Sequence, residues 1–146
     1  MFEIKDPKEV KVVVSKVLKK IGMFILEKSK ENMDRIVPKM RNTGYLRRSG
    51  GPENMKELSG GGWQFGFEAP YASFVEFGTG VAVGHKPYMP PEAPIKEWVK
   101  RKLKKKGKEL DRVTKAVQFH IFKEGIRARP FFRPAIDEAR RLGLIK

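Results

Sequence analysis

One carboxylate in this sequence lies where its chemistry could be tuned. Glu76 is surrounded by aromatic and small residues in the stretch YASFVEFGTG, residues 71–80. A half-buried carboxylate in such a setting can act as a general acid or base. It can also accept hydrogen bonds that hold the turn after it. No second acid or nucleophile accompanies Glu76, so we favour the structural role and predict no catalytic residue.

The two histidines, His85 and His120, are the other side chains that could transfer a proton or bind a metal. They are far apart in the sequence, and neither belongs to a triad or a metal-ligand pattern. A zinc site needs three or four nitrogen, sulfur or oxygen ligands, and the chain has no cysteine. We therefore expect no metal and no cofactor. A small hydrolase built on Glu76 and His85 is the least favoured hypothesis, because it has neither a nucleophile nor a metal set.

The densest group of charges is the run KRKLKKKGK at 100–108. Its seven basic residues are Lys100, Arg101, Lys102, Lys104, Lys105, Lys106 and Lys108. Such a run can bind phosphates, because each neutralised phosphate releases counterions. It can equally be the solvated face of a helix. The formal net charge of +15 favours an acidic partner, and the run is a candidate patch for an anion or an acidic protein.

A long N-terminal helix is expected to position the rest of the chain, from about residue 7 to residue 36. Asp6, Pro7 and Glu9 have the types and spacing of an N-cap, a first-turn proline and a capping-box acid. Pro38 disfavours helical geometry just before it. Apolar residues at helical spacing predict the inward face: Val10, Val14, Val17, Ile21, Phe24 and Ile25.

Two strands are expected to follow this helix. Residues 42–51 predict a turn running into a short strand, and residues 61–70 alternate Trp63, Phe65 and Phe67 with small or polar residues. This period of two is typical of a half-buried strand. We expect a small antiparallel sheet under the helix, with the three aromatics in the core rather than stacked on bases. Glycine-rich residues at about 50–62 predict a mobile hairpin excursion.

The second half of the sequence predicts helices separated by loops. A short helical turn carries Tyr71, Phe74 and Val75, and a second mobile loop is expected at about 78–91. Pro94 is expected to open a helix that Gly107 closes, with Ile95, Trp98, Val99 and Leu103 facing inward. Another helix is expected at about 109–124, with Leu110, Val113, Val117 and Ile121 inward and Gly125 at its end. A last helix is expected from Pro134 to Leu142.

The order of these elements predicts an α+β fold, with a long N-terminal helix packed on a small antiparallel sheet and further C-terminal helices. A chain of 146 residues is expected to form a single domain over 1–146. Its longest apolar run, residues 21–26, is far below the roughly 20 residues that span a bilayer. We expect no membrane-spanning segment and no membrane partner.

Four segments, read in order, match one family: VPKMRNTGYLRRS (37–49), YASFVEFGTG (71–80), PPEAPIKEWVKRK (90–102) and GIRARPFFRPAIDEA (125–139). Together they resemble the tail-completion proteins of long-tailed double-stranded DNA phages and related archaeal viruses. Members of this family are also called neck, head–tail joining or minor tail proteins. The resemblance covers about two thirds of the chain.

The resemblance implies a non-enzymatic structural protein of the virion, assembled in the host cytoplasm. It implies a homo-oligomeric ring that joins or completes the tail at the head–tail interface. The implied partners are head connector or portal-side proteins on one side and tail-tube or tail-terminator proteins on the other. Contact with DNA would be weak and generic. Two features depart from the family: the long first helix and the very basic residues 100–108.

The family signature falls on three groups of residues, which the resemblance implicates in fold and assembly. The first group is Thr43, Gly44, Leu46, Arg47 and Ser49, the second is Tyr71, Ala72, Glu76, Gly78 and Thr79, and the third is Pro130, Phe131, Arg133, Pro134 and Ala135. Glu76 is expected to accept from the backbone N–H groups of residues 78–80, or from an arginine such as Arg47 or Arg133. The alternative function is a sequence-independent double-stranded DNA-binding protein that uses residues 100–108.

Overall fold

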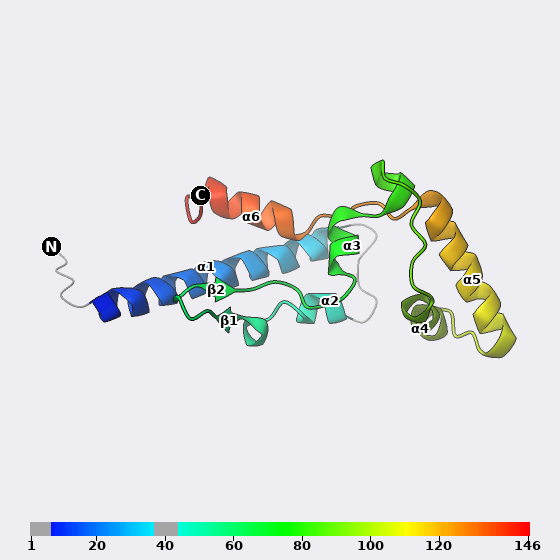
Figure 1. The fold of residues 1–146 in the computed structure, drawn as a ribbon, viewed down its shortest axis with the longest axis horizontal. Coiled ribbons are helices and arrows are strands. Elements are labelled where there is room, and N and C mark those ends of the chain that lie inside the picture. The colour runs from blue at the N-terminus through cyan, green and yellow to red at the C-terminus, as the bar shows by residue number, and fades with distance from the viewer. Residues whose placement is uncertain (1–6, 37–43) are drawn as a thin grey trace. The chain divides into compact units, whose positions relative to one another are not determined.

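A computed structural model describes residues 7–36 and 44–146 of the protein (Figure 1). The helices of this part of the chain are α1 (Pro7–Arg35), α2 (Tyr45–Arg48), α3 (Ala72–Phe77), α4 (Glu92–Lys102), α5 (Gly107–Glu124) and α6 (Phe132–Arg141). Two short 3₁₀ helices are η1 (Pro52–Asn54) and η2 (Gly80–Val83), and the strands are β1 (Lys56–Glu57) and β2 (Trp63–Gln64). The long N-terminal helix, the small antiparallel sheet and the further C-terminal helices confirm the predicted α+β fold.

The contacts between residues divide the chain into two compact units. Unit 1 comprises Met1–Ala72 and Phe131–Lys146, and unit 2 comprises Ser73–Pro130. Two such units can be parts of one domain or two separate domains. The single domain expected over 1–146 therefore stays a prediction.

In unit 1, α6 lies antiparallel beside the C-terminal part of α1 (Figure 1). Ala135 and Ala139 of α6 are fully buried against Ile25 of α1. Small alanine side chains let the two helices approach closely, and larger side chains then surround the contact. The surrounding residues are Ile21, Phe24, Phe65, Phe132, Ile136 and Ile145.

The aromatic residues of the segment after β2 contribute to this core, as their alternation predicts. Phe65 packs edge-on against Phe132, with ring centroids 6.3 Å apart. Phe67 packs edge-on against Phe131 at 5.1 Å. The indole N–H of Trp63 donates to the Ser15 hydroxyl at 2.9 Å, which fixes β2 against α1.

The strand positions differ from the prediction. Residues 45–48 form α2 rather than a strand, and β1 lies at Lys56–Glu57, inside the segment predicted to be a loop. β1 pairs antiparallel with β2, in the register Lys56 to Gln64. The hairpin therefore turns within residues 58–62, and its ladder is much shorter than predicted.

The inward face predicted for α1 is correct only in its C-terminal half. Ile25 is buried and Ile21 and Phe24 are partly buried, whereas Val14 and Val17 are about half exposed, at 48% and 50%. The reason is that α6 ends before the N-terminal part of α1 (Figure 1).

In unit 2, α4 and α5 pack against each other along an apolar seam. Ile95, Val99 and Leu110 are buried in it, and Val113, Val117 and Ile121 pack around them, as predicted. Trp98 and Leu103 were also expected to face inward, but they are 37% and 43% exposed.

The bounds of these C-terminal helices also differ in part from prediction. α4 ends at Lys102 rather than at Gly107, and Gly107 instead begins α5. α5 ends at Glu124, and Gly125 follows it as predicted, with φ at +74°. α6 begins at Phe132, two residues before the expected Pro134. No helix in the described parts of the chain is long and apolar enough to cross a bilayer.

Candidate functional site: signature segments and the basic run

The first signature group holds one loop of unit 1 in place through Ser49. Ser49 is buried, and its hydroxyl donates to the carbonyl of Leu46 at 2.8 Å. The same hydroxyl accepts from the backbone N–H of Ala69 at 3.2 Å, and the Ser49 carbonyl accepts from the N–H of Glu68 at 3.2 Å. A buried serine with its donor and acceptor both engaged fixes two chain segments to each other.

The other members of this group surround α2. Gly44 precedes α2 with φ at +73°, a left-handed conformation that glycine adopts without a steric penalty. Leu46 is buried. Arg47 contacts Asp34 of α1 through Nη2 at 3.4 Å. Thr43 lies outside the described residues.

The second signature group contains the carboxylate of Glu76. Glu76 is buried in α3, with 4% of its surface exposed. Two of the backbone N–H groups expected to bind it have other acceptors: the N–H of Gly78 donates to the carbonyl of Phe74 at 2.9 Å, and that of Thr79 donates to the carbonyl of Ile126 at 2.8 Å. The remaining donors expected for Glu76, the N–H of Gly80 or an arginine, stay predictions. The structural role of Glu76 itself stays a prediction.

Gly78 and Thr79 join α3 to the segment after α5, and both lie in unit 2. Thr79 and Ile126 exchange two backbone hydrogen bonds as an isolated antiparallel bridge. Gly78 has φ at +72°, and a Cβ there would lie 2.5 Å from the carbonyl oxygen of Ile126 and 2.7 Å from the nitrogen of Ala128. Only glycine fits this approach of two backbones. Sequence reasoning missed Ile126, because a bridge between distant residues leaves no local periodicity.

The remaining residues of the second group flank this junction. Ala72 begins α3. Tyr71 precedes it and is 38% exposed, with its ring centroid 6.4 Å from that of Tyr45. Both tyrosines belong to unit 1 and present polar rings at its surface.

The third signature group begins α6 and forms part of the core of unit 1. Phe131 is 1% exposed, and its carbonyl accepts from the side-chain amide of Asn32 in α1 at 3.0 Å. Ala135 is completely buried at the α1–α6 contact. Pro130, Arg133 and Pro134 are exposed. The buried members of this group therefore explain how α6 attaches to α1.

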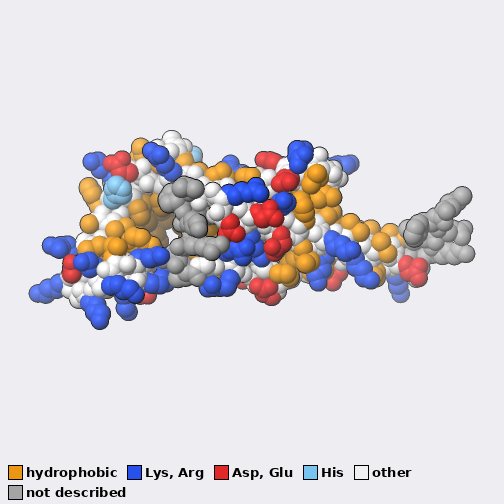
Figure 2. Space-filling view, turned by 180° about the vertical axis from the view of Figure 1, so that it is seen from behind, with side chains coloured by type: hydrophobic (Ala, Val, Ile, Leu, Met, Phe, Trp, Pro, Cys, Tyr) orange, Lys and Arg blue, Asp and Glu red, His pale blue; other side chains and the backbone are white. Residues whose placement is uncertain are grey.

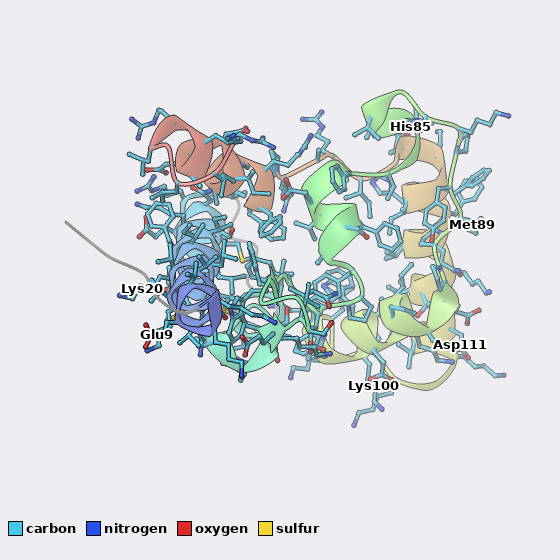
Figure 3. All side chains as sticks on the ribbon, turned by 60° about the vertical axis from the view of Figure 1, so that its left-hand side comes forward. Glu9, Lys20, His85, Met89, Lys100 and Asp111 are labelled. Atoms are coloured by element: carbon cyan, nitrogen blue, oxygen red, sulfur yellow. The ribbon has the colours of Figure 1, made fainter. Side chains whose placement is uncertain are left out.

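The basic run spans the last turn of α4 and the start of α5. Six of its seven cations are exposed, and Lys105 is partly buried. Among the described residues, only Lys105 of these seven has an ion pair, with Glu109 at 2.8 Å. The hydrogen bond from Lys105, together with its charge, lowers the pKa of Glu109 below its ordinary value. Figure 3 shows the Lys100 side chain extending away from α4.

Acidic side chains offset the charge on the neighbouring faces of α4 and α5. Lys96 contacts Asp111 at 2.6 Å, and Lys115 contacts Glu92 at 2.6 Å. The hydrogen bond and charge of Asp111 raise the pKa of Lys96. These pairs lie outside residues 100–108, so they do not neutralise the six exposed cations of the run.

Both histidines are exposed, His85 after η2 and His120 on α5 (His85 is labelled in Figure 3). Within residues 7–36 and 44–146, no group of three or more His, Asp or Glu side chains is arranged to hold a metal ion. The candidate features are therefore of two separate kinds. One is the set of backbone contacts made by the signature residues, and the other is the exposed basic run at 100–108. Comparison with protein-family models, with curated proteins and with solved structures finds no match for this chain.

Proposed function

We propose that this protein is a non-enzymatic structural component of a tailed virion, which joins or completes the tail at the head–tail interface. It acts as a ring of identical copies, between portal-side connector proteins and tail-tube or tail-terminator proteins. The observation that carries the proposal is the ordered resemblance of four segments to tail-completion proteins. The roles of the signature residues in the structure support it.

These roles are those of residues that specify a fold. Ser49 fixes a loop, Gly78 admits a second backbone, and Phe131 and Ala135 are buried in the core. A signature made of such residues is expected where related chains share a fold and differ in their surfaces. We therefore infer that the chain shares the fold of tail-completion proteins, and we infer the assembly role from that shared fold.

A ring at the head–tail interface needs one small contact between neighbouring copies, repeated around the symmetry axis. Head-to-tail contacts between different surfaces of two copies generate such a ring when the rotation closes. Each contact can be weak, because later contacts form at high effective concentration. The two loops at about 50–62 and 78–91 offer exposed apolar side chains for this purpose. These are Leu58 in the first loop and Val81 and Met89 in the second.

The basic run is assigned to an acidic protein partner or to the exterior of the ring. A channel that DNA must pass through should not hold phosphates tightly, and many inward cations would do so. Under this proposal, removing cations from 100–108 weakens assembly more than it changes DNA passage.

The alternative function is sequence-independent binding to double-stranded DNA. It is favoured by the six exposed cations of the run that have no ion pair among the described residues. Fluorescence anisotropy with a labelled DNA duplex at several salt concentrations separates the two functions. Submicromolar binding at physiological salt, with an affinity that falls steeply as the salt concentration rises, would favour the alternative. A protein of the head–tail interface should bind the duplex only weakly.

The experiment that tests the virion role is sequencing of the DNA on either side of the gene. Genes for virion assembly are commonly clustered, so we expect portal, capsid or connector genes on one side and a tail-tube gene on the other. A gene that stands alone among host genes would contradict the proposal and leave DNA binding as the leading function.

A further inference from the structure

The N-terminal half of α1 carries an apolar surface that α6 does not cover. Five of its side chains are exposed large hydrophobics. Val12, at 54%, faces away from the α6 contact, since each residue advances by about 100° around the helix. The other four lie toward the side of that contact: Val13 at 58%, Val14 at 48%, Val17 at 50% and Leu18 at 37%. With the partly buried Val10, they form what we name the α1 stripe. Single exposed apolar residues are ordinary, but a contiguous group on one helix marks an interaction site.

The stripe continues the face of α1 that packs against α6. Val10, Val14 and Val17 precede Ile21 and Phe24 at alternating steps of four and three residues, the spacing of a helix-packing seam. Ile21 and Phe24 pack against the α6 cluster. The N-terminal part of α1 extends beyond the end of α6 (Figure 1), and Val14 and Val17 are about half exposed. The seam is thus occupied by a helix along one half and is open along the other.

The β hairpin does not cover the stripe, because it contacts a different side of α1. Its contacts come from Lys11, whose Nζ donates to the carbonyl of Ser59, and from Ser15, which donates to Glu57. Ser15 lies about 100° round the helix from Val14, since each residue advances by that angle. The hairpin therefore holds the segment in place and leaves the valines open.

The sequence of this half of α1 gives it little helix stability of its own. Val12, Val13, Val14 and Val17 are β-branched and have lower helix propensity than leucine or lysine. Most helices in proteins owe their stability to packing of an apolar face. A partner that covers the stripe would supply packing of this kind.

The charges around the stripe indicate what that partner is. Residues 7–20 contain five lysines and one glutamate. At about 100° per residue, Lys11 and Lys20 border the stripe on its two sides, whereas the other three lysines lie on the opposite side of α1. Figure 3 shows Lys20 and Glu9 extending from α1. Seen from behind, the part of α1 at the right of Figure 2 shows basic side chains interspersed with apolar ones. Two copies of the same helix would bring like charges together, which disfavours pairing, whereas acidic flanks complement the lysines.

We propose that the α1 stripe binds an acidic amphipathic helix of another protein, which extends the seam occupied by α6. The apolar face of that helix covers Val14 and Val17, and its Asp or Glu residues face Lys11 and Lys20, which border the stripe. The inference does not depend on the virion role, because the partner is defined by its apolar face and its charge alone.

The test uses a fluorescein-labelled synthetic helix as probe, with leucine at the core positions of three heptads and glutamate at the flanking positions. Binding is measured by fluorescence anisotropy with the full-length protein. We expect saturable binding, and at least about tenfold weaker binding to the same peptide with lysine in place of glutamate.

Two double variants locate the binding surface. Val14→Ala with Val17→Ala removes apolar bulk from the stripe while raising helix propensity, so lost binding cannot come from a lost helix. Val12→Ala with Met23→Ala is the matched control. Val12 and Met23 are exposed, and at about 100° per residue they lie on the side of α1 opposite Val14 and Val17. We expect the first variant to bind the acidic peptide at least about tenfold more weakly and the control to bind as the wild type does.

Several outcomes would overturn the inference. These are absence of binding to the acidic peptide, equal binding of the acidic and lysine peptides, and unchanged binding by the Val14→Ala, Val17→Ala variant. Self-association that this variant abolishes, seen by analytical ultracentrifugation, would instead assign the stripe to a second copy. Co-sedimentation with phosphatidylglycerol vesicles that the variant abolishes would assign it to an anionic lipid surface.

Discussion

Gly78 shows how one signature residue is explained by the approach of two backbones. Its positive φ and the short distances to Ile126 and Ala128 leave no room for a side chain. Gly78→Ala should lower the free energy of unfolding by about 2–4 kcal/mol, because it adds a clash to a left-handed conformation. Chemical denaturation followed by circular dichroism measures the change.

Gly84 provides the control for this prediction. Its φ is +76°, and nothing lies within 4 Å of the position of an added Cβ. Gly84→Ala should therefore cost only the backbone term, about 1 kcal/mol. Equal losses for the two variants would show that the contact with residues 126–128 does not explain Gly78.

Glu76 is predicted to stabilise its surroundings rather than catalyse a reaction. Because it is 4% exposed, replacing the carboxylate by an amide of the same size should weaken its charge-assisted hydrogen bonds. Glu76→Gln should lower the melting temperature, while Glu68→Gln, at an exposed position, should not. A catalytic activity of the protein that Glu76→Gln abolishes would refute the structural role.

The pair Lys105–Glu109 gives a test of the charges in the basic run. The pKa of Glu109 is lowered in the folded protein, so the stabilisation by this pair is present above the unfolded carboxyl pKa. It is lost as the pH falls through the lower folded pKa. Lys105→Gln should return the pKa of Glu109 toward 4.5, as measured by carbon NMR titration of its carboxyl group. Lys102→Gln should leave that pKa unchanged, and an equal shift in both variants would contradict the assignment.

At the level of elements, the α1–α6 contact is predicted to dominate the stability of unit 1. Ile25 is 2% exposed and packs against two completely buried alanines. Ile25→Ala should lower the free energy of unfolding by about 2–5 kcal/mol, because it removes buried methyl groups and leaves a cavity. Val13→Ala, at a 58% exposed position of the same helix, should change it by less than about 0.5 kcal/mol. Similar losses in the two variants, again measured by denaturation, would contradict the described packing.

The helices could be predicted from the sequence because their signals are local. The proline and acid at the start of α1 and the glycine after α5 mark helix ends through contacts within one turn. The burial of α1 could not be predicted in its N-terminal half. Val14 and Val17 have the same periodicity as Ile21 and Phe24, and only the length of α6 decides which of them are covered.

The strands were harder to predict because pairing depends on distant residues. Residues 45–48 form a helix that buries one side chain, Leu46, and so short an element carries no period. β1 contains Lys56 and Glu57, both exposed, so its sequence lacks the apolar alternation of a half-buried strand. The alternation did predict correctly that Phe65 and Phe67 contribute to the core, whereas Trp63 is half-buried and contacts Ser15 and Lys19 of α1.

At the level of the whole molecule, the proposal is that a +15 chain functions through repeated protein contacts. The exposed apolar side chains of the two loops would contact neighbouring copies, and the basic run and the α1 stripe would contact acidic partners. The resemblance itself stays a prediction. The burial of Ser49, Glu76 and Phe131, and the pairing of Thr79 with Ile126, came only from the structure.

The most direct test of the virion role is quantitative peptide mass spectrometry on tailed particles purified from a culture that makes the protein. The account predicts that the protein is present in the particles, in a small copy number that matches the symmetry of the joint and far below that of the tail-tube protein. Its absence from particles, while it is abundant in the lysate, would contradict the account.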